Sequence, residues 1–128
     1  MSITNAGRDY ICSAIVGTAT PAFNSANSYI AVGSGTTAFS ATQTALVSPL
    51  TSARNGMQST YPSVATNVIS FRANFGTTDA QGAWNEWGVF NASSGGTMLN
   101  RKVESLGTKP GTQTWQFTVT LTLTVPAT

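Results

Sequence analysis

The C-terminal part of the chain reads Trp115-Gln116-Phe117-Thr118-Val119-Thr120-Leu121-Thr122-Leu123-Thr124-Val125, an unbroken alternation of apolar and polar residues. A period of two is typical of a β-strand with one buried face and one polar face. A strand of this length would span about 35 Å, near twice the usual strand length. We therefore expect it either to bend across both layers of a sandwich or to meet another subunit at one end.

Shorter strands are predicted upstream of this stretch. Val68–Phe75 also alternates, with Ile69, Phe71, Ala73 and Phe75 on one face. Asn55-Gly56 is typical of a tight hairpin, here between strands at residues 51–54 and 57–61. Further strands are expected at residues 29–32, 84–91 and 97–103.

One helix is predicted, over residues 5–16, with Thr4 or Asn5 as its cap and Gly17 at its end. Its apolar residues fall on one face at helical spacing; they are Tyr10, Ile11, Ala14 and Ile15. Many strands, one short helix and no alternation of strands with helices predict a mainly β fold. We expect a single domain over residues 1–128, an antiparallel β-sandwich of about six to eight strands between residues 28 and 125.

The residues that usually carry chemistry are scarce. The chain has no histidine, one cysteine and four carboxylates, and charged residues make up 8% of it, against about 25% in a typical soluble domain. Catalysis at neutral pH needs groups that exchange protons, attack as nucleophiles or hold metals. We therefore expect a structural or binding protein that is not an enzyme and that uses no metal or other cofactor. Cys12, within the predicted helix, is expected to be a small buried hydrophobe.

Three acidic residues offer a pair for glycoside hydrolysis, namely Asp79, Glu86 and Glu104. Nothing in their spacing selects a pair, so solvated or ion-paired side chains are the favoured interpretation. The glycine-rich stretch at residues 33–38 matches a loose dinucleotide-binding fingerprint, but no helix or spaced acidic residue follows it. We interpret it as a tight turn.

The charge pattern gives no sign of nucleic-acid binding. The formal net charge is +2, and the basic residues are scattered apart from the adjacent pair Arg101-Lys102, whereas nucleic-acid binders usually show a basic cluster. The N-terminus lacks the pattern of a signal peptide, and no apolar run reaches the roughly 20 residues that span a bilayer. Synthesis in a cytoplasm, without a membrane anchor, is expected.

Tryptophan placement suggests an interface. Trp84 and Trp87 have opposite parity in a regular strand, so one of them is expected to be half-exposed or covered by a partner. A tryptophan covered by a loop of its own chain is the alternative. Trp84, Trp87, Trp115 and Tyr61 also offer a sugar-stacking platform, although Trp115 lies in the apolar register of its strand and is expected in the core.

Five segments of the chain combine structural turns with core residues. They are Gly7-Arg8-Asp9-Tyr10-Ile11, residues 29–39, Ala41-Thr42-Gln43-Thr44-Ala45-Leu46, residues 84–91 and Gly95-Gly96-Thr97-Met98-Leu99-Asn100-Arg101. Together they resemble a group of short β-rich virion proteins of tailed bacteriophages. The resemblance implies a capsid decoration (cement) protein, a head or neck fibre, or a tail-fibre module. Small size, one compact domain and the lack of a fibre-like repeat favour decoration.

The resemblance also implies partners and a location. The resemblance implies a homotrimer that sits on the outer capsid surface and binds the major capsid protein. Many decoration proteins use a long N-terminal arm, whereas here only residues 1–4 precede the helix. We expect Ser2, Ile3 and Thr4 to add main-chain hydrogen bonds to a capsid strand, and the exposed member of the Trp84/Trp87 pair to touch the capsid or a second subunit. The alternative is a tail- or neck-fibre module that binds a host surface receptor or glycan.

Overall fold

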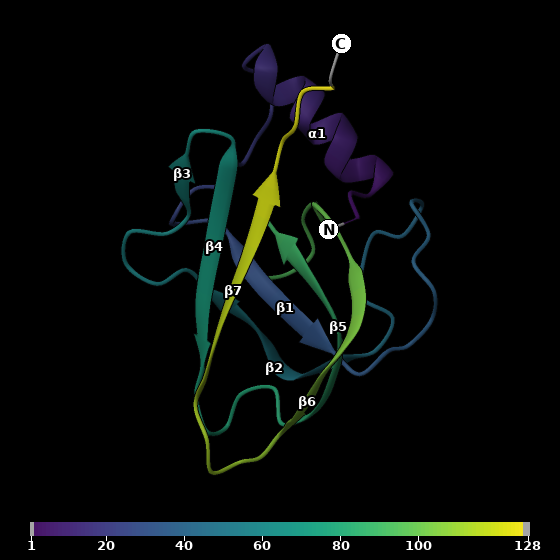
Figure 1. The fold of residues 1–128 in the computed structure, drawn as a ribbon, viewed down its shortest axis with the longest axis vertical. Helices are drawn as coiled ribbons and strands as arrows, with labels where there is room; N and C mark the ends of the chain where they lie inside the picture. The colour runs from purple at the N-terminus through teal and green to yellow at the C-terminus, as the bar shows by residue number, and fades with distance from the viewer. Residues whose placement is uncertain (1, 127–128) are drawn as a thin grey trace.

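The computed structural model describes residues 2–126 and shows two antiparallel sheets packed face to face, with one helix at an end of the sandwich (Figure 1). The larger sheet has the strand order β2-β1-β5-β6 and the smaller one the order β3-β4-β7. The elements are α1 (Asn5–Ile15), β1 (Tyr29–Gly33), β2 (Pro49–Gly56), β3 (Ser63–Ala65), β4 (Val68–Phe75), β5 (Gly82–Phe90), β6 (Lys102–Lys109) and β7 (Trp115–Thr122). The predicted mainly β sandwich with one N-terminal helix is confirmed.

The core lies between the two sheets. The larger sheet contributes residues of β1, β2 and β5, and the smaller sheet contributes the predicted inward faces of β4 and β7. The buried residues of this core are Ile30, Val32, Ala53, Phe71, Ala73, Phe75, Ala80, Trp84, Trp87, Val89, Leu99, Val119 and Leu121. Complete burial of such side chains contributes roughly 1.5–3 kcal/mol each, so this cluster is the main source of fold stability.

A second, smaller apolar cluster lies on the other face of the larger sheet. It contains Ala31, Leu46, Phe90 and Met98. Leu46 belongs to the irregular segment between β1 and β2, which therefore covers this face. Both faces of β1 and of the C-terminal half of β5 are buried as a result, so neither segment shows the alternation of a strand with one solvent-exposed face.

Helix α1 is attached to the sandwich through its first turn. The Thr4 hydroxyl caps the helix by accepting a hydrogen bond of 2.9 Å from the N–H of Gly7. An added Cβ at Gly7 would lie 2.1 Å from the carbonyl oxygen of Leu99, so only glycine permits this close approach. The last turn projects beyond the sheets, and Cys12 is exposed. The prediction of a buried cysteine is wrong because its side of the helix faces away from the core.

Strands β4 and β7 pair without a break over eight residues each, from Val68 opposite Thr122 to Phe75 opposite Trp115. The alternation of β7 is confirmed, but its regular strand ends at Thr122, because β4 begins at Val68 and offers no longer partner. Leu123 and Val125, the last two apolar residues of the pattern, are 55% and 91% exposed.

The predicted hairpin at Asn55-Gly56 is wrong. Both residues lie inside β2, where Asn55 faces Ile30 and Gly56 faces Tyr29. The Asn55 amide donates hydrogen bonds to the Asn74 carbonyl oxygen (2.8 Å) and to the carboxylate that follows β4. These tertiary contacts keep the backbone extended where the local sequence favours a turn.

Two further boundaries differ from expectation. The strand predicted at residues 97–103 is reduced to isolated bridges at Met98 and Asn100, and the regular strand β6 begins at Lys102. β6 lacks clean alternation, and it contains Gly107 with a φ of +102°. A strand with an irregular backbone gives no period-two signal in the sequence.

Candidate functional site

The N-terminal segment is already paired within its own chain. The N–H of Thr4 donates to the carbonyl oxygen of Leu99 (3.2 Å), and the N–H of Arg101 donates to that of Ser2 (3.1 Å). Ile3 forms an antiparallel bridge with Asn100. Thr4 is 1% exposed. These main-chain groups are therefore already paired within the chain, and the expected hydrogen bonds of Ser2, Ile3 and Thr4 to a capsid strand stay a prediction.

Both tryptophans proposed as contacts are buried, Trp84 at 1% and Trp87 at 5% exposure. The expectation that one of them is exposed is wrong, because the pairing of β5 with β6 is irregular between them. Trp84 faces Gly107 in β6, whereas Glu86 faces Val103, so the register shifts by two residues at this point. The irregularity places both indoles in the core.

The aromatic side chains do not assemble into one sugar-stacking platform. Trp115 packs edge-on against Trp84 with ring centroids 5.0 Å apart. Tyr61 lies elsewhere, under the guanidinium of Arg72 at 4.6 Å. Trp115 is partly buried and packed against the core, close to its expected position.

The three carboxylates considered for hydrolysis all have partners. Asp79 accepts hydrogen bonds from the Asn55 amide and from the N–H of Gly76. Glu104 accepts one from the Trp87 indole (2.9 Å) and forms an ion pair with a neighbouring lysine. Glu86 is fully buried. The favoured interpretation as ion-paired side chains holds for Glu86 and Glu104.

Glu86 is the centre of a buried polar cluster. Its carboxylate accepts hydrogen bonds from Nε of Arg101 (2.8 Å) and from the N–H groups of Gly35 (2.9 Å), Val47 (2.9 Å) and Ser48 (2.7 Å). Burial raises the pKa of the Glu86 carboxyl, but these four donors together lower it more, so the net pKa lies below its ordinary value. The cluster fastens the segment between β1 and β2 onto the sheet.

The glycine-rich stretch serves this cluster. A Cβ at Gly33 would lie 2.6 Å from Oε2 of Glu86, and one at Gly35 would lie 2.4 Å from it. The predicted tight turn is wrong, because Gly33 ends β1 and Gly35 follows in irregular backbone that forms no turn. The glycines are needed for the close approach of a carboxylate. Arg101 of the adjacent basic pair is likewise buried, so the pair forms no basic surface.

Within residues 2–126, no three histidine, cysteine or acidic side chains gather in a way that holds a metal ion. The same part of the chain contains no helix that is long and apolar enough to cross a bilayer.

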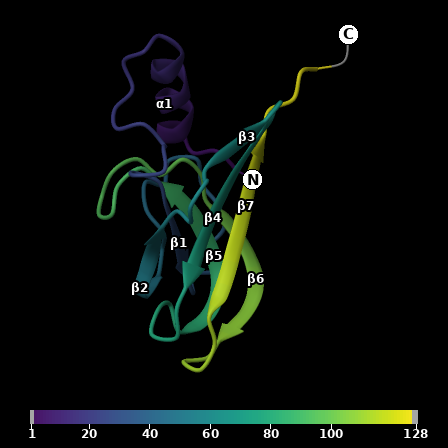
Figure 2. The ribbon, with the colours of Figure 1, turned by 90° about the vertical axis from the view of Figure 1, so that its left-hand side faces the viewer.

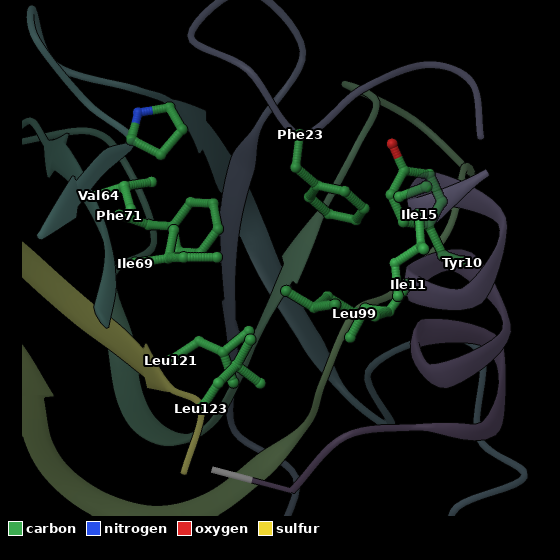
Figure 3. A pocket seen from close by; sticks show the side chains of 12 residues that line it. Tyr10, Ile11, Ile15, Phe23, Val64, Ile69, Phe71, Leu99, Leu121 and Leu123 are labelled. Carbon is green, nitrogen blue, oxygen red and sulfur yellow. The ribbon is translucent and has the colours of Figure 1, made fainter. Parts of the chain in front are cut away.

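An apolar groove of about 400 Å³ opens between α1 and the smaller sheet (Figure 3). Tyr10 and Ile11 of the helix form one wall, and β3, β4 and β7 form the other. Phe23, which packs edge-on against Tyr10 at 4.8 Å, lies between the walls. The residues lining it are Tyr10, Ile11, Ala14, Ile15, Phe23, Pro62, Val64, Ile69, Phe71, Leu99, Leu121 and Leu123.

Several large aliphatic side chains at the rim of this groove are exposed to solvent. Ile15 is 80% exposed, Val64 72% and Leu123 55%. Val16 (72%) follows Ile15 directly in the chain, and Val125 (91%) lies two residues after Leu123. The lining contains no charged side chain. Exposed aliphatic side chains grouped around an apolar groove are typical of a protein interaction site.

Four of the lining residues are the predicted apolar face of α1, to which no function was assigned from the sequence. A signal was present: the alternation of β7 runs on to Leu123 and Val125, past the end of β4. Apolar residues without a partner strand to cover them indicate an exposed surface.

No protein-family model and no curated protein sequence matches this chain.

Proposed function

We propose that this protein is a bacteriophage virion structural protein of the capsid decoration type. It binds the major capsid protein on the outer surface of the head and stabilises the shell. It acts by binding, without turning over a substrate and without a cofactor. The observation that carries the proposal is the uncharged apolar groove between α1 and the smaller sheet, with exposed aliphatic side chains at its rim.

The groove fits an apolar element of a protein partner. Its volume lies in the range of ligand pockets in proteins. Burying an exposed aliphatic side chain contributes roughly 1.5–3 kcal/mol, a gross gain from which the cost of association is subtracted, so Ile15 and Val64 are expected to be the main anchors. The resemblance to phage decoration proteins supports the capsid as that partner.

Stabilisation of the shell follows from selective binding. A protein that binds neighbouring subunits of the mature lattice, but not dissociated subunits, shifts the equilibrium toward the assembled shell by mass action. In this proposal, the buried Glu86–Arg101 ion pair and the sandwich core hold the domain in one conformation while it is bound to the shell.

Co-sedimentation tests the proposal. Purified protein is mixed with DNA-free mature heads of the phage that encodes it, and separately with host cells. We expect binding to heads, weakened about tenfold or more in the double variant Ile15→Ser/Val64→Ser because two anchors are lost. Val47→Ser is the matched control, because Val47 is 45% exposed and does not line the groove.

Two results would overturn this assignment. Binding to heads that is equally strong in the double variant would exclude the groove. Binding to cells but not to heads would favour the alternative, a tail- or neck-fibre module that recognises a host receptor or glycan.

A further inference from the structure

Strand β7 has one paired edge and one open edge. Within residues 2–126 its backbone hydrogen bonds go to β4 and, at Leu123, to Asn67, which precedes β4. The four residues Gln116, Thr118, Thr120 and Thr122 are exposed. Figure 2 shows β7 at the margin of its sheet, with the following residues running beyond the sandwich.

The backbone parity identifies the residues that face the open edge. The N–H of Leu123 donates to the carbonyl oxygen of Asn67 (2.9 Å), so the odd-numbered residues of β7 point their backbone groups at β4. The hydrogen bonding of Arg72, which lies opposite Thr118, is consistent with this assignment. Its carbonyl oxygen accepts from the N–H of Gln58 on the other side of β4, so the pair of Arg72 and Thr118 is not hydrogen-bonded. The N–H and C=O groups of the even-numbered residues are therefore directed outward.

This edge lacks the features that protect edge strands from pairing with other chains, namely charged residues, proline and bulges. β7 contains no charged residue, no proline and no shift in its register with β4. Such an edge pairs readily with another strand. Its exposed face is a row of threonines, and cross-strand threonine pairs are favourable.

The same strand carries an apolar projection at one end and a hollow at the other. Leu123 and Val125 are exposed at the C-terminal end. At the start of β7, a hollow of about 370 Å³ is lined by Trp115 and Phe117, together with Trp84 and Leu106 of the larger sheet and the polar Thr114 and Gln116. The projection and the hollow are complementary, but one copy cannot join them because they lie at opposite ends of one strand.

We propose that two copies of this chain pair through β7 in antiparallel orientation, about a two-fold axis at Thr120. The alternating stretch spans residues 115–125, whose midpoint is Thr120. Antiparallel pairing about that midpoint places Leu123 opposite Phe117 and Val125 opposite Trp115 of the second copy. The apolar projection of each copy then enters the hollow of the other.

This register also matches the backbone. It pairs outward-facing residues with one another, Thr120 with itself, Thr118 with Thr122 and Gln116 with Thr124, as an antiparallel ladder requires. The result is a continuous six-stranded sheet, β3-β4-β7 extended by the same strands of the second copy. The inference goes beyond the proposed function and does not rest on it. It gives a closed pair instead of the trimer that the resemblance implies.

Analytical ultracentrifugation of the purified protein tests the pairing. We expect a dimer whose dissociation constant rises about tenfold or more in Thr120→Pro, because both symmetry-related N–H donors at the axis are lost. Thr120→Val is the matched control, since it keeps the N–H and is expected to dimerise as the natural chain does.

A cross-link tests the register without depending on the proline variant. In a Cys12→Ser background, Thr120→Cys is expected to form a disulfide between copies, because paired residues at this position lie about 5.5 Å apart between Cα atoms. Ser94→Cys, in an exposed loop, is expected not to do so. A monomer or a trimer in the centrifuge, or a dimer without the Thr120→Cys cross-link, would overturn the inference whatever the capsid assay gives.

Discussion

Glu86 and Arg101 form an ion pair with Oε1 and Nε 2.8 Å apart, and both side chains are fully buried. Removing one partner of such a pair leaves an uncompensated charge in the interior, which costs roughly 3–5 kcal/mol. Glu86→Gln should therefore lower the free energy of unfolding by about that amount in urea denaturation. Asp9→Asn should change it by less than about 1 kcal/mol, because the Arg8–Asp9 pair is largely exposed. Equal effects of the two substitutions would contradict a structural role for the buried pair.

The Glu86 carboxylate makes the stability of the fold depend on pH. The pKa of Glu86 in the folded protein lies below its ordinary value, so the unfolded state binds the proton more readily. The stabilisation is fully present above the ordinary glutamate pKa of about 4.3 and is lost as the pH falls through the lower folded-state pKa. Urea midpoints measured across the acid range should fall steeply for the natural chain. In Glu86→Gln the part of the fall that comes from this carboxylate should be absent. An unchanged dependence of the urea midpoint on pH would contradict a lowered pKa of Glu86.

The close approach of the glycine segment to Glu86 predicts a steric effect. Gly35→Ala should destabilise the fold by roughly 1–3 kcal/mol, as overpacking of a buried site does, because the new Cβ would lie 2.4 Å from Oε2 of Glu86. Gly76→Ala is the matched comparison, since its nearest neighbour would be at 3.5 Å. Thermal denaturation of both variants measures the difference. Similar transition temperatures would show that the segment is not held against the carboxylate.

The groove predicts binding of a small apolar probe to the free protein. A naphthalene sulfonate dye should become fluorescent with the native chain, because the lining between α1 and the smaller sheet is apolar and open. Ile15→Ser/Val64→Ser should reduce the fluorescence severalfold, whereas Val47→Ser should leave it unchanged. Since Ile15 and Val64 are exposed, their replacement should alter the stability by less than about 1 kcal/mol. Undiminished fluorescence in the double variant would place the dye elsewhere.

Sequence patterns predicted those parts of the fold that depend on local periodicity. The alternation of β4 and β7 gave both their extent and their buried faces, apart from the last residues of the C-terminal pattern. The cap at Thr4 and the glycine at position 17, which has a φ of +80°, gave the bounds of α1 to within one residue.

The errors share a physical cause, which is contact between distant segments. Asn55 is extended because its amide bonds to residues that follow β4. Trp84 and Trp87 are both buried because β5 and β6 shift register between them. Parity arguments hold only within a regular strand, and the sequence does not mark where regularity ends.

The candidate site was only partly accessible from the sequence. The apolar face of α1 was predicted, but the opposite wall depends on how far β3, β4 and β7 extend past the larger sheet. Likewise, residues 2–4, which were expected to hydrogen-bond to a capsid strand, pair with residues 99–101, a contact across most of the chain length. The sequence pointed most directly to an interaction site at the end of the alternating C-terminal stretch. One of the two expectations for that long stretch was that one end meets another subunit.

Calorimetry of DNA-free mature heads tests the central claim most directly. Heads saturated with the natural chain should dissociate at a higher temperature than bare heads, because binding to the assembled lattice stabilises it. Heads mixed with Ile15→Ser/Val64→Ser at the same concentration should dissociate close to the temperature of bare heads. If the double variant protects the heads as well as the natural chain does, or if neither protein raises the transition, the account of a shell-stabilising groove is contradicted.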